Sequence, residues 1–326
     1  MARSRIFVTQ PIAESALARL RAVADVAVNP DGTRVPDQAT LIAGVKNADI
    51  LFALLHDTVD KAVIAANPGL RAIASMTITP DRIDVAEATK RGIIVTNIPA
   101  VVTDATADIN FAILLAVARN VVIGDRKFRE GMYPGSQGNY FAGAAVSGKT
   151  LGIIGAGRIG QAVARRGRGF NMRIVYADPR RLPADVEKAL EATHLPMDEV
   201  LRQADFISLH PQLAPETRHL MSDAQFALMK PTAFIVNTSR GPVIEEAALV
   251  RALKAKKIAG AGLDVYEFEP QVSAELVAMD NVVLTPHLGS AVLELREGMA
   301  NIVADNAIAI IEGHRPPNCI NPEVLT

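Results

Sequence analysis

Residues 149–160, KTLGIIGAGRIG, decide the fold of this chain. An apolar strand pattern covers 150–154, and apolar side chains recur at helical spacing over 158–170. The turn between them contains three glycines: Gly155, Gly157 and Gly160. The first allows a tight turn, the second lets a pyrophosphate approach the backbone, and the third lets the helix pack on the strand. Because the helix N-terminus also offers unpaired N–H groups to phosphates, the stretch predicts a dinucleotide-binding turn.

A second apolar strand, RIVYA, ends at Asp178, 18 residues past Gly160, where a ribose-binding acid is expected. A glycine turn can also serve only to pack a helix, and Asp178 could merely cap its own loop. The carboxylate would bond both ribose hydroxyls and repel a 2′-phosphate, which favours NAD. Arg180 and Arg181 are close enough in sequence to accept that phosphate, so use of NADP stays open.

The composition narrows the class of protein. At 326 residues the chain is longer than one hydrophobic core usually supports, so two domains are expected. A hydrophobic content of 49% and a charged content of 21% are typical of soluble globular proteins. The net charge of −1 gives no electrostatic reason to expect nucleic acid or an anionic membrane as a partner. The first residues do not have the pattern of a secretory signal, and no apolar run reaches about eighteen residues.

The cysteine and histidine content gives no indication of a metal. The single cysteine, Cys319, excludes a disulfide framework and a cysteine-based metal cluster, which fits a reducing cytoplasm. His56, His194, His219 and His314 are interpreted as solvated or packing residues, although the loop that contains His56 (53–60) is also expected to face the cleft. No two of these four histidines have metal-ligand spacing, so no metal is expected.

The glycine turn lies mid-chain, so the residues ahead of it need a fold of their own. Over residues 1–102 short β-rich runs alternate with helical patterns, which predicts a parallel α/β domain. Residues 103–122 predict one long linking helix with Thr103 or Asp104 as N-cap. Residues 129–148, rich in glycine and aromatics, have no period and are interpreted as a packed loop.

From Thr150 onward six predicted strands alternate with helices, which predicts a Rossmann-type doubly wound parallel sheet. A last helix over 290–313 then carries the chain away, and the residues after it are too few for a domain. We therefore expect a dinucleotide-binding domain over 103–296. The first domain, 1–102, would bind the substrate and would be completed by 297–326.

Candidate catalytic side chains follow the ends of the later strands. They are His210, Arg240, Asp264, Glu269 and His287. In a doubly wound sheet, ligands bind beyond these strand ends. An arginine can clamp a carboxylate, and a histidine can supply a proton near neutral pH. A carboxylate bonded to that histidine favours its charged form. Beside a nicotinamide this set would suffice for hydride transfer to a carbonyl, although His210 could equally be structural.

Four sequence blocks resemble the D-2-hydroxyacid dehydrogenases, and the similarity spans essentially the whole chain. The blocks are GIIGAGRIG (152–160), NTSRGPVIEEAAL (237–249), GAGLDVYEFEP (260–270) and NVVLTPHLGSA (281–291). The resemblance implies that Arg240, Glu269 and His287 are catalytic and that Asp264 holds the nicotinamide carboxamide. It also implies a flavodoxin-like α/β substrate domain, an active-site cleft between the two domains, and a homodimer formed through the nucleotide domain.

Within that family, PHLGSAVLELREGM and GHRPPNCINPEV are similar to the glyoxylate and hydroxypyruvate reductases. The resemblance therefore implies NAD(P)-dependent reduction of a small 2-oxoacid, or the reverse reaction. The chain departs from the family at SMTITPDRID, where Thr79 and Pro80 replace the usual glycine before an aspartate. A Cβ at Thr79 and the missing N–H of Pro80 should alter the cradle for the substrate carboxylate.

The residues and the resemblance together give a set of expected contacts. Those to the cofactor are Gly155, Gly157, Arg158, Ile159, Gly160, Asp178, His210, Thr238 and Asp264. Those to the substrate are Leu55, His56, Thr79, Arg240 and Ser290.

Two other functions stay open. A phosphoglycerate-dehydrogenase-like enzyme is one, although no regulatory extension follows Thr326. An NAD-sensing interaction protein similar to the corepressors of the same family is the other, although all three catalytic positions are filled. Formate-type dehydrogenases pair the histidine with glutamine, and Glu269 argues against them.

Overall fold

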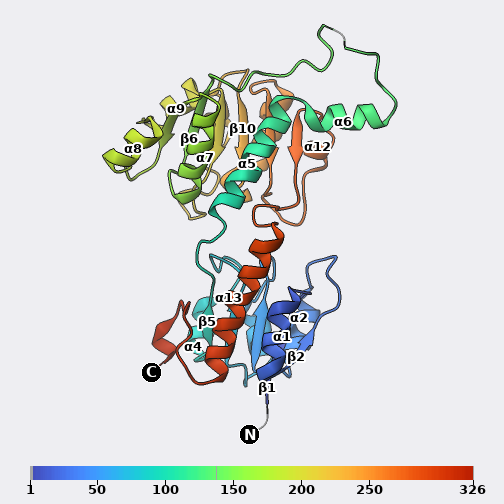
Figure 1. Cartoon of the computed structure of the whole chain (residues 1–326), viewed down its shortest axis with the longest axis vertical. Coiled ribbons are helices and arrows are strands. Elements are labelled where there is room, and N and C mark those ends of the chain that lie inside the picture. The colour runs from blue at the N-terminus through green and yellow to red at the C-terminus, as the bar shows by residue number, and fades with distance from the viewer. Residues whose placement is uncertain (1–2, 137, 326) are drawn as a thin grey trace. The chain divides into compact units, whose positions relative to one another are not determined.

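The structure, a computed structural model, describes residues 3–136 and 138–325. Two compact units are present (Figure 1). One contains the chain up to Val101 together with the chain from Val292 onward. The other is Val102–Ala291.

The first unit has a parallel sheet in the order β2-β1-β3-β4-β5, five strands within the described residues. This order is the flavodoxin-like one. The strands are β1 (Ser4–Val8), β2 (Ala24–Val28), β3 (Ile50–Ala53), β4 (Ala72–Ser75) and β5 (Ile94–Thr96). The helices are α1 (Glu14–Val23), α2 (Gln38–Val45), α3 (Lys61–Ala65), α4 (Val85–Lys90) and α13 (Leu293–Ile311), with a short 3-10 turn, η2 (Pro322–Leu325).

The C-terminal segment is part of this first unit. Helix α13 packs against α1 and β4. Beyond it, the Asn321 side chain accepts a hydrogen bond from the Val95 N–H at 2.8 Å, and Thr96 pairs with Cys319. The last residues therefore cover the edge of the sheet at β5, which would otherwise expose unpaired backbone groups.

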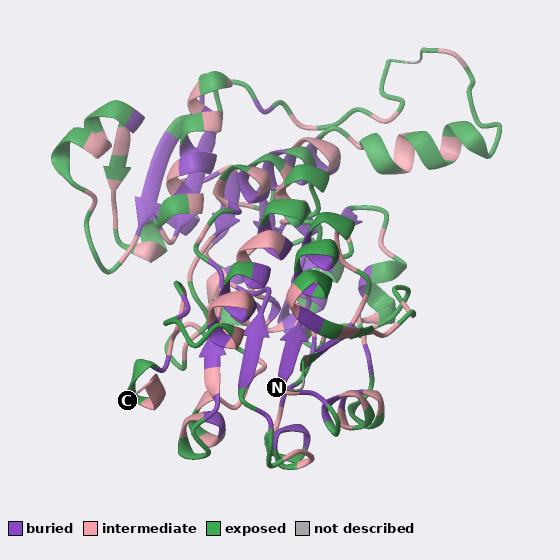
Figure 2. Ribbon diagram, turned by 60° about the horizontal axis from the view of Figure 1, so that its bottom comes forward, coloured by how far each residue is buried: buried purple, intermediate pink, exposed green. Residues whose placement is uncertain are grey.

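The second unit has a parallel sheet in the order β12-β11-β10-β9-β6-β7-β8, seven strands over the described residues. These strands are β6 (Thr150–Ile154), β7 (Arg173–Ala177), β8 (Ala192–His194), β9 (Phe206–Leu209), β10 (Phe234–Asn237), β11 (Gly260–Leu263) and β12 (Val282–Leu284). All six pairings are parallel, and the order reverses beside β6, as in doubly wound sheets. The central strands are fully buried (Figure 2).

The helices of the second unit are α5 (Thr103–Ala118), α6 (Val121–Arg129), α7 (Arg158–Gly169), α8 (Ala184–Leu190), α9 (Met197–Gln203), α10 (Asp223–Phe226), α11 (Glu246–Lys254) and α12 (Ala274–Val277), with a 3-10 turn, η1 (Gly241–Val243). The sequence predicted six strands, and the structure adds β8. Its three residues, ATH, are only partly buried at the sheet edge and have no apolar run, so hydrophobic periodicity could not detect them.

The helix predicted over 103–122 ends earlier than expected. Asn120 adopts a left-handed conformation (φ 55°), and α5 and α6 are bent by 64° where they meet. None of the described residues of α6 is buried, and the loop after it is mostly exposed, so the prediction of a packed loop over 129–148 was wrong (Figure 2). Among the described residues no single helix has the length and composition to span a membrane; α5 and α6 meet that test only jointly, across their bend.

Candidate active site

The glycine turn after β6 has the geometry that its sequence predicts. Gly155 has a φ of +90°, and a Cβ there would lie 2.7 Å from the backbone of His210. A Cβ on Gly160 would lie 2.2 Å from the Gly155 carbonyl oxygen, so helix and turn approach as only glycine allows. A Cβ on Gly157 would have no described atom within 4 Å, which leaves this face of the turn open.

Helix α7 begins directly after this open face. Gly157 is its N-cap, and no side chain of the described residues caps it. Arg158 and Ile159 are its first two residues. Uncapped N–H groups and the positive end of the helix dipole suit a pyrophosphate, so the turn fits a dinucleotide.

Asp178 connects the end of β7 to the glycine turn. Its Oδ2 atom accepts a hydrogen bond from the Ala156 N–H at 2.8 Å, and its Oδ1 atom accepts one from the Arg180 N–H at 2.8 Å. The carboxylate therefore caps its own loop, as the alternative interpretation proposed. It also lies against the glycine turn, where a ribose-binding acid is needed.

His287 and Glu269 form a hydrogen-bonded pair. His287 Nδ1 lies 3.2 Å from Glu269 Oε2, and the two side chains are only 17% and 12% exposed. Glu269 Oε1 accepts a hydrogen bond from the Tyr266 N–H at 3.0 Å. The carboxylate is thus held by two contacts, one to the Tyr266 backbone and one to the His287 ring, and the second fixes the orientation of the imidazole.

Asp264 holds the turn that carries His287. Its Oδ1 atom accepts hydrogen bonds from the Thr285 hydroxyl at 2.6 Å and the Leu288 N–H at 2.7 Å, and its Oδ2 atom accepts one from the Gly289 N–H at 2.8 Å. Burial raises the pKa of this carboxyl group. His287 has a φ of +54°, which is uncommon for a residue other than glycine. The sequence assigned Asp264 to the cofactor and did not predict this turn-holding role.

The loop after β10 brings Arg240 beside the segment that leads to Glu269. Asn237 binds both ends of the loop, donating to the Arg240 carbonyl at 3.0 Å and accepting from the Ser239 N–H at 3.0 Å. A Cβ on Gly241 would lie only 1.8 Å from the Tyr266 carbonyl oxygen. Glycine at this position therefore allows the two backbones to pack in direct contact.

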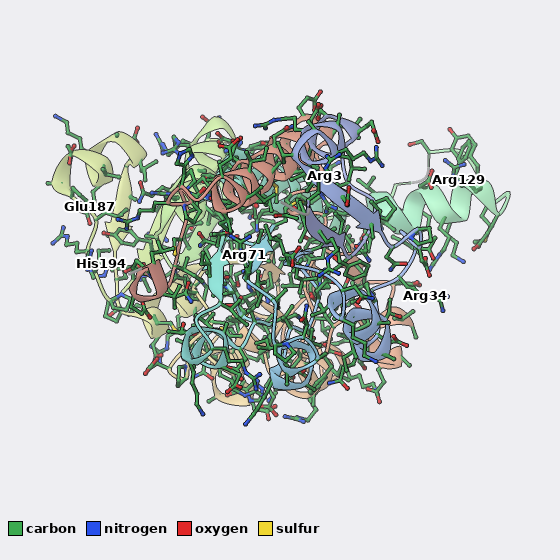
Figure 3. All side chains as sticks on the ribbon, turned by 90° about the horizontal axis from the view of Figure 1, so that it is seen from below. Arg3, Arg34, Arg71, Arg129, Glu187 and His194 are labelled. Carbon is green, nitrogen blue, oxygen red and sulfur yellow. The ribbon has the colours of Figure 1, made fainter. Side chains whose placement is uncertain are left out.

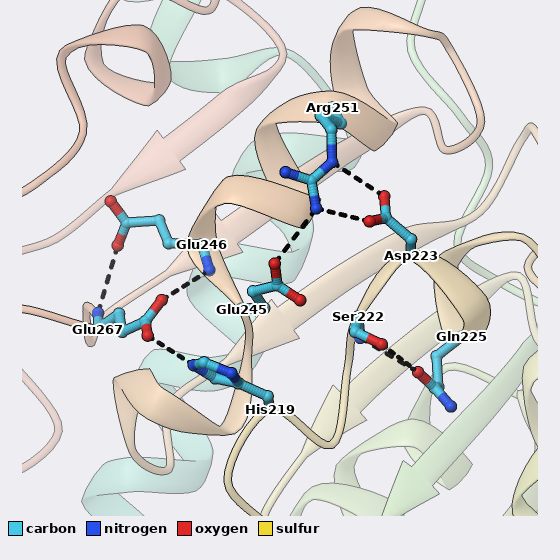
Figure 4. Close-up of polar contacts among 8 residues, drawn as sticks. All are labelled: His219, Ser222, Asp223, Gln225, Glu245, Glu246, Arg251 and Glu267. Carbon is cyan, nitrogen blue, oxygen red and sulfur yellow. Dashed lines mark hydrogen bonds and ion pairs between the residues drawn. The ribbon is translucent and has the colours of Figure 1, made fainter.

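A polar network around Glu267 also holds the segment that leads to Glu269 (Figure 4). Glu267 Oε1 lies 2.6 Å from His219 Nε2, and Glu267 Oε2 accepts a hydrogen bond from the Glu246 N–H at 2.9 Å. In addition, the Oε2 atom of Glu246 accepts a hydrogen bond from the Glu267 N–H at 3.2 Å. His219 is therefore joined to this network by a specific contact with Glu267. Sequence reasoning could not find this network, because its members are far apart along the chain.

His210 ends a buried polar chain under the glycine turn. Its Nε2 atom lies 2.8 Å from the Ser208 hydroxyl, which donates to Asn110 Oδ1, and Asn110 donates to the Thr238 hydroxyl. Burial lowers the pKa of His210 to about 3, so the ring is neutral at neutral pH and unsuited to act as the acid. Its Nδ1 atom is buried without a hydrogen-bond partner among the described residues. A bound ligand would satisfy such an atom, which fits the predicted cofactor contact.

The predicted substrate contacts of the first unit lie after its strands. Leu55 and His56 follow β3 and are partly buried, beside the buried Asp57, which accepts a hydrogen bond from the Leu54 N–H at 2.6 Å. Thr79 follows β4, and its hydroxyl donates to Asp81 at 2.9 Å. In the second unit, Ser290 lies just after the turn of His287 and is partly buried.

Comparison with known proteins identifies the family. Residues 111–289 match the NAD binding domain of the D-isomer specific 2-hydroxyacid dehydrogenases. Glyoxylate reductase of Thermococcus litoralis is 45% identical, over 99% of this chain and 98% of its own. A crystal structure of a glyoxylate reductase from Paecilomyes thermophila is 32% identical, with a TM-score of 0.82 over 99% of both chains.

A NADPH-dependent glyoxylate/hydroxypyruvate reductase from Sinorhizobium meliloti, solved with NADP and malonate, is 28% identical, with a TM-score of 0.82 over 98% of this chain and 97% of that one. These matches agree with the glycine turn and with the strand order of the second unit. The chain therefore belongs to the D-isomer specific 2-hydroxyacid dehydrogenases, oxidoreductases that act on the CH–OH group of their donors with a nicotinamide cofactor.

Proposed function

We propose that the chain reduces glyoxylate, or a similarly small 2-oxoacid such as hydroxypyruvate, to the corresponding 2-hydroxyacid. The observation that carries the proposal is the contact of 3.2 Å between His287 Nδ1 and Glu269 Oε2. It gives a histidine oriented and supported for proton transfer, in a chain that is 45% identical to the glyoxylate reductase of Thermococcus litoralis.

In this proposal the bound nicotinamide supplies the hydride for the substrate carbonyl carbon. His287 gives the proton on Nε2 to the carbonyl oxygen, because its Nδ1 atom is bonded to Glu269. Glu269 stabilises the charged imidazole before the transfer. Arg240 binds the substrate carboxylate and orients the carbonyl, as its planar fork of donors allows.

The glycine turn and Asp178 bind the cofactor, with Thr238, His210 and Asp264 as further contacts. We assign cofactor binding to residues 103–296 and substrate binding to residues 1–102 with 297–326. Leu55, His56, Thr79 and Ser290 are the proposed remaining substrate contacts. Because Pro80 lacks an N–H, the loop after β4 offers one backbone donor fewer, and Arg240 carries more of the carboxylate binding.

A panel of 2-oxoacids tests the proposal. The panel contains glyoxylate, hydroxypyruvate, pyruvate and phosphohydroxypyruvate, each tested with NADH and NADPH. We expect the highest kcat/KM with glyoxylate or hydroxypyruvate. A preference for phosphohydroxypyruvate would support the phosphoglycerate-dehydrogenase alternative, and tight NADH binding without turnover would support an interaction protein.

We also propose that the protein is a homodimer in the cytoplasm, with a second copy covering α6 and the loop after it. Figure 1 shows this segment standing clear of the sheet of its own unit. Its large apolar side chains are exposed: Val121 55%, Val122 51%, Phe128 62% and Tyr133 67%. A patch of this kind marks an interaction surface. Light scattering should give a dimer for the native chain and a monomer for Val122→Asp/Phe128→Asp; a monomeric native chain would contradict this.

A further inference from the structure

The segment after β7 contains an arginine held by a glutamate. Arg181 Nε lies 3.0 Å from Glu187 Oε1, and the second nitrogen of its fork lies 2.9 Å from Glu187 Oε2. This bidentate geometry is the most directional pairing available to an arginine and a carboxylate. Arg181 belongs to the loop that follows Asp178, and Glu187 belongs to α8.

Glu187 is fixed by a second contact. The hydroxyl of Tyr176 donates to Glu187 Oε1 at 2.5 Å and accepts from the Leu182 N–H at 2.9 Å. Tyr176 is buried in β7, and its ring lies 4.9 Å from that of His194. Figure 3 shows Glu187 and His194 at the same edge of the second unit. The hydrogen bond from the Arg181 guanidinium lowers the pKa of Glu187 most, and the bond from the Tyr176 hydroxyl lowers it further, to about 2. This carboxylate is therefore charged at neutral pH.

The position of this pair matters for the adenosine ribose of the cofactor. Asp178, which binds the glycine turn, lies only three residues before Arg181. A 2′-phosphate at this ribose would bring about two negative charges beside Asp178 and would need an arginine to neutralise them. The nearby Arg181 is already bonded to Glu187, which carries a negative charge itself.

We propose that Glu187 determines the preference for NADH over NADPH by holding Arg181 away from the 2′ position of the adenosine ribose. This rests on the proposed binding of the cofactor at the glycine turn and Asp178. Binding of NADPH requires Arg181 to leave Glu187, whereas binding of NADH leaves the pair intact. Arg181 is itself 69% exposed, and pairs with an exposed partner are weak, so the effect on affinity is on the order of fivefold.

Direct binding tests this inference without turnover. NADH and NADPH are titrated against the full chain by nicotinamide fluorescence, and 5′-AMP is compared with 2′,5′-ADP by calorimetry. We expect the native chain to prefer NADH and 5′-AMP. In Glu187→Gln, which keeps an acceptor for Tyr176, the Kd for NADPH and 2′,5′-ADP should fall about fivefold while that for NADH changes less than about twofold.

Three control variants identify the group responsible. Asp185→Asn removes an equal charge from the first turn of α8 and should leave the Kd for NADPH unchanged. The gain in NADPH affinity of Glu187→Gln should disappear when Arg181→Gln is added to it. The gain should persist when Arg180→Gln is added instead. The inference is wrong if Asp185→Asn gives the same gain, or if the gain depends on Arg180.

Failure of this inference is distinguishable from failure of the proposed function. If the native chain binds neither dinucleotide, the proposed function is contradicted. If it binds NADH but Glu187→Gln and Glu187→Ala both leave the Kd for NADPH unchanged, only the role of Glu187 is wrong. Thermal melts of both variants check that each is folded at the temperature of the titration.

Discussion

His287 Nδ1 and Glu269 Oε2 lie 3.2 Å apart, although the two residues belong to different loops. Each loop is fixed by its own contacts. Asp264 binds the turn of His287 on both sides, and Glu267 binds the segment of Glu269 to α11. Contacts within the protein therefore position the pair, as proton transfer in a defined direction requires.

The close contact between Gly241 and Tyr266 predicts that a single methyl group added at Gly241 severely lowers both stability and activity. Gly241→Ala would place a Cβ at 1.8 Å from the Tyr266 carbonyl oxygen, so one backbone must move. We expect the protein to lose at least about 3 kcal/mol of unfolding free energy and most of its activity. Urea unfolding and kcat/KM measure the two effects. Gly298→Ala, which meets no described atom within 4 Å in α13, is the control and should be neutral or slightly stabilising. Equal behaviour of the two variants would contradict the account.

Asp264→Asn tests whether this residue holds the turn of His287. The amide keeps one oxygen acceptor and replaces the other with an NH2 group, so either the Leu288 N–H or the Gly289 N–H would face a donor and lose its acceptor. We expect a loss of about 1–3 kcal/mol in unfolding free energy without any cofactor present, together with a lower kcat. If the cofactor-free stability is unchanged and only NADH binding weakens, Asp264 is a cofactor contact and not a support of the turn.

The hydrogen bonds of Glu267 predict that this residue helps to position Glu269 without contacting the substrate. Glu267→Gln weakens the bonds to His219 and Glu246 (Figure 4), so the segment carrying Glu269 becomes less fixed. We expect kcat to fall several-fold while the Kd for NADH stays within about twofold. Glu275→Gln on α12, a half-exposed site, is the matched control. An unchanged kcat in Glu267→Gln would show that the network has no part in positioning.

The burial of the His210 ring predicts that the unfolding free energy depends on pH. Its pKa is lowered by burial from 6.5 to about 3 in the folded chain, so between these values the unfolded chain binds the extra proton. Stability contributed by the neutral ring is present above about pH 6.5 and is lost as the pH falls towards 3. The unfolding free energy of the native chain should therefore drop more steeply between about pH 7.5 and 4.5 than that of His210→Gln. Parallel curves would contradict the burial of this ring.

Sequence reasoning predicted the parts of the fold that depend on local patterns. The glycine turn, the buried strands and the residues at their ends follow from spacing and periodicity, and the structure brings His287 and Glu269 together as expected. The edge strand β8 and the bend at Asn120 have no such pattern. The contacts of Asp264 and Glu267 join residues about 20 or more positions apart, and only the folded chain brings these together.

The most direct test of the account is the rate of glyoxylate reduction by His287→Asn under single-turnover conditions, with NADH binding measured in parallel. Asparagine tolerates the left-handed backbone of this position but cannot supply the proton. We expect a fall of at least about a hundredfold in rate, with the Kd for NADH within about twofold of the native value. A rate within about threefold of the native chain would contradict the assignment of His287 as the acid.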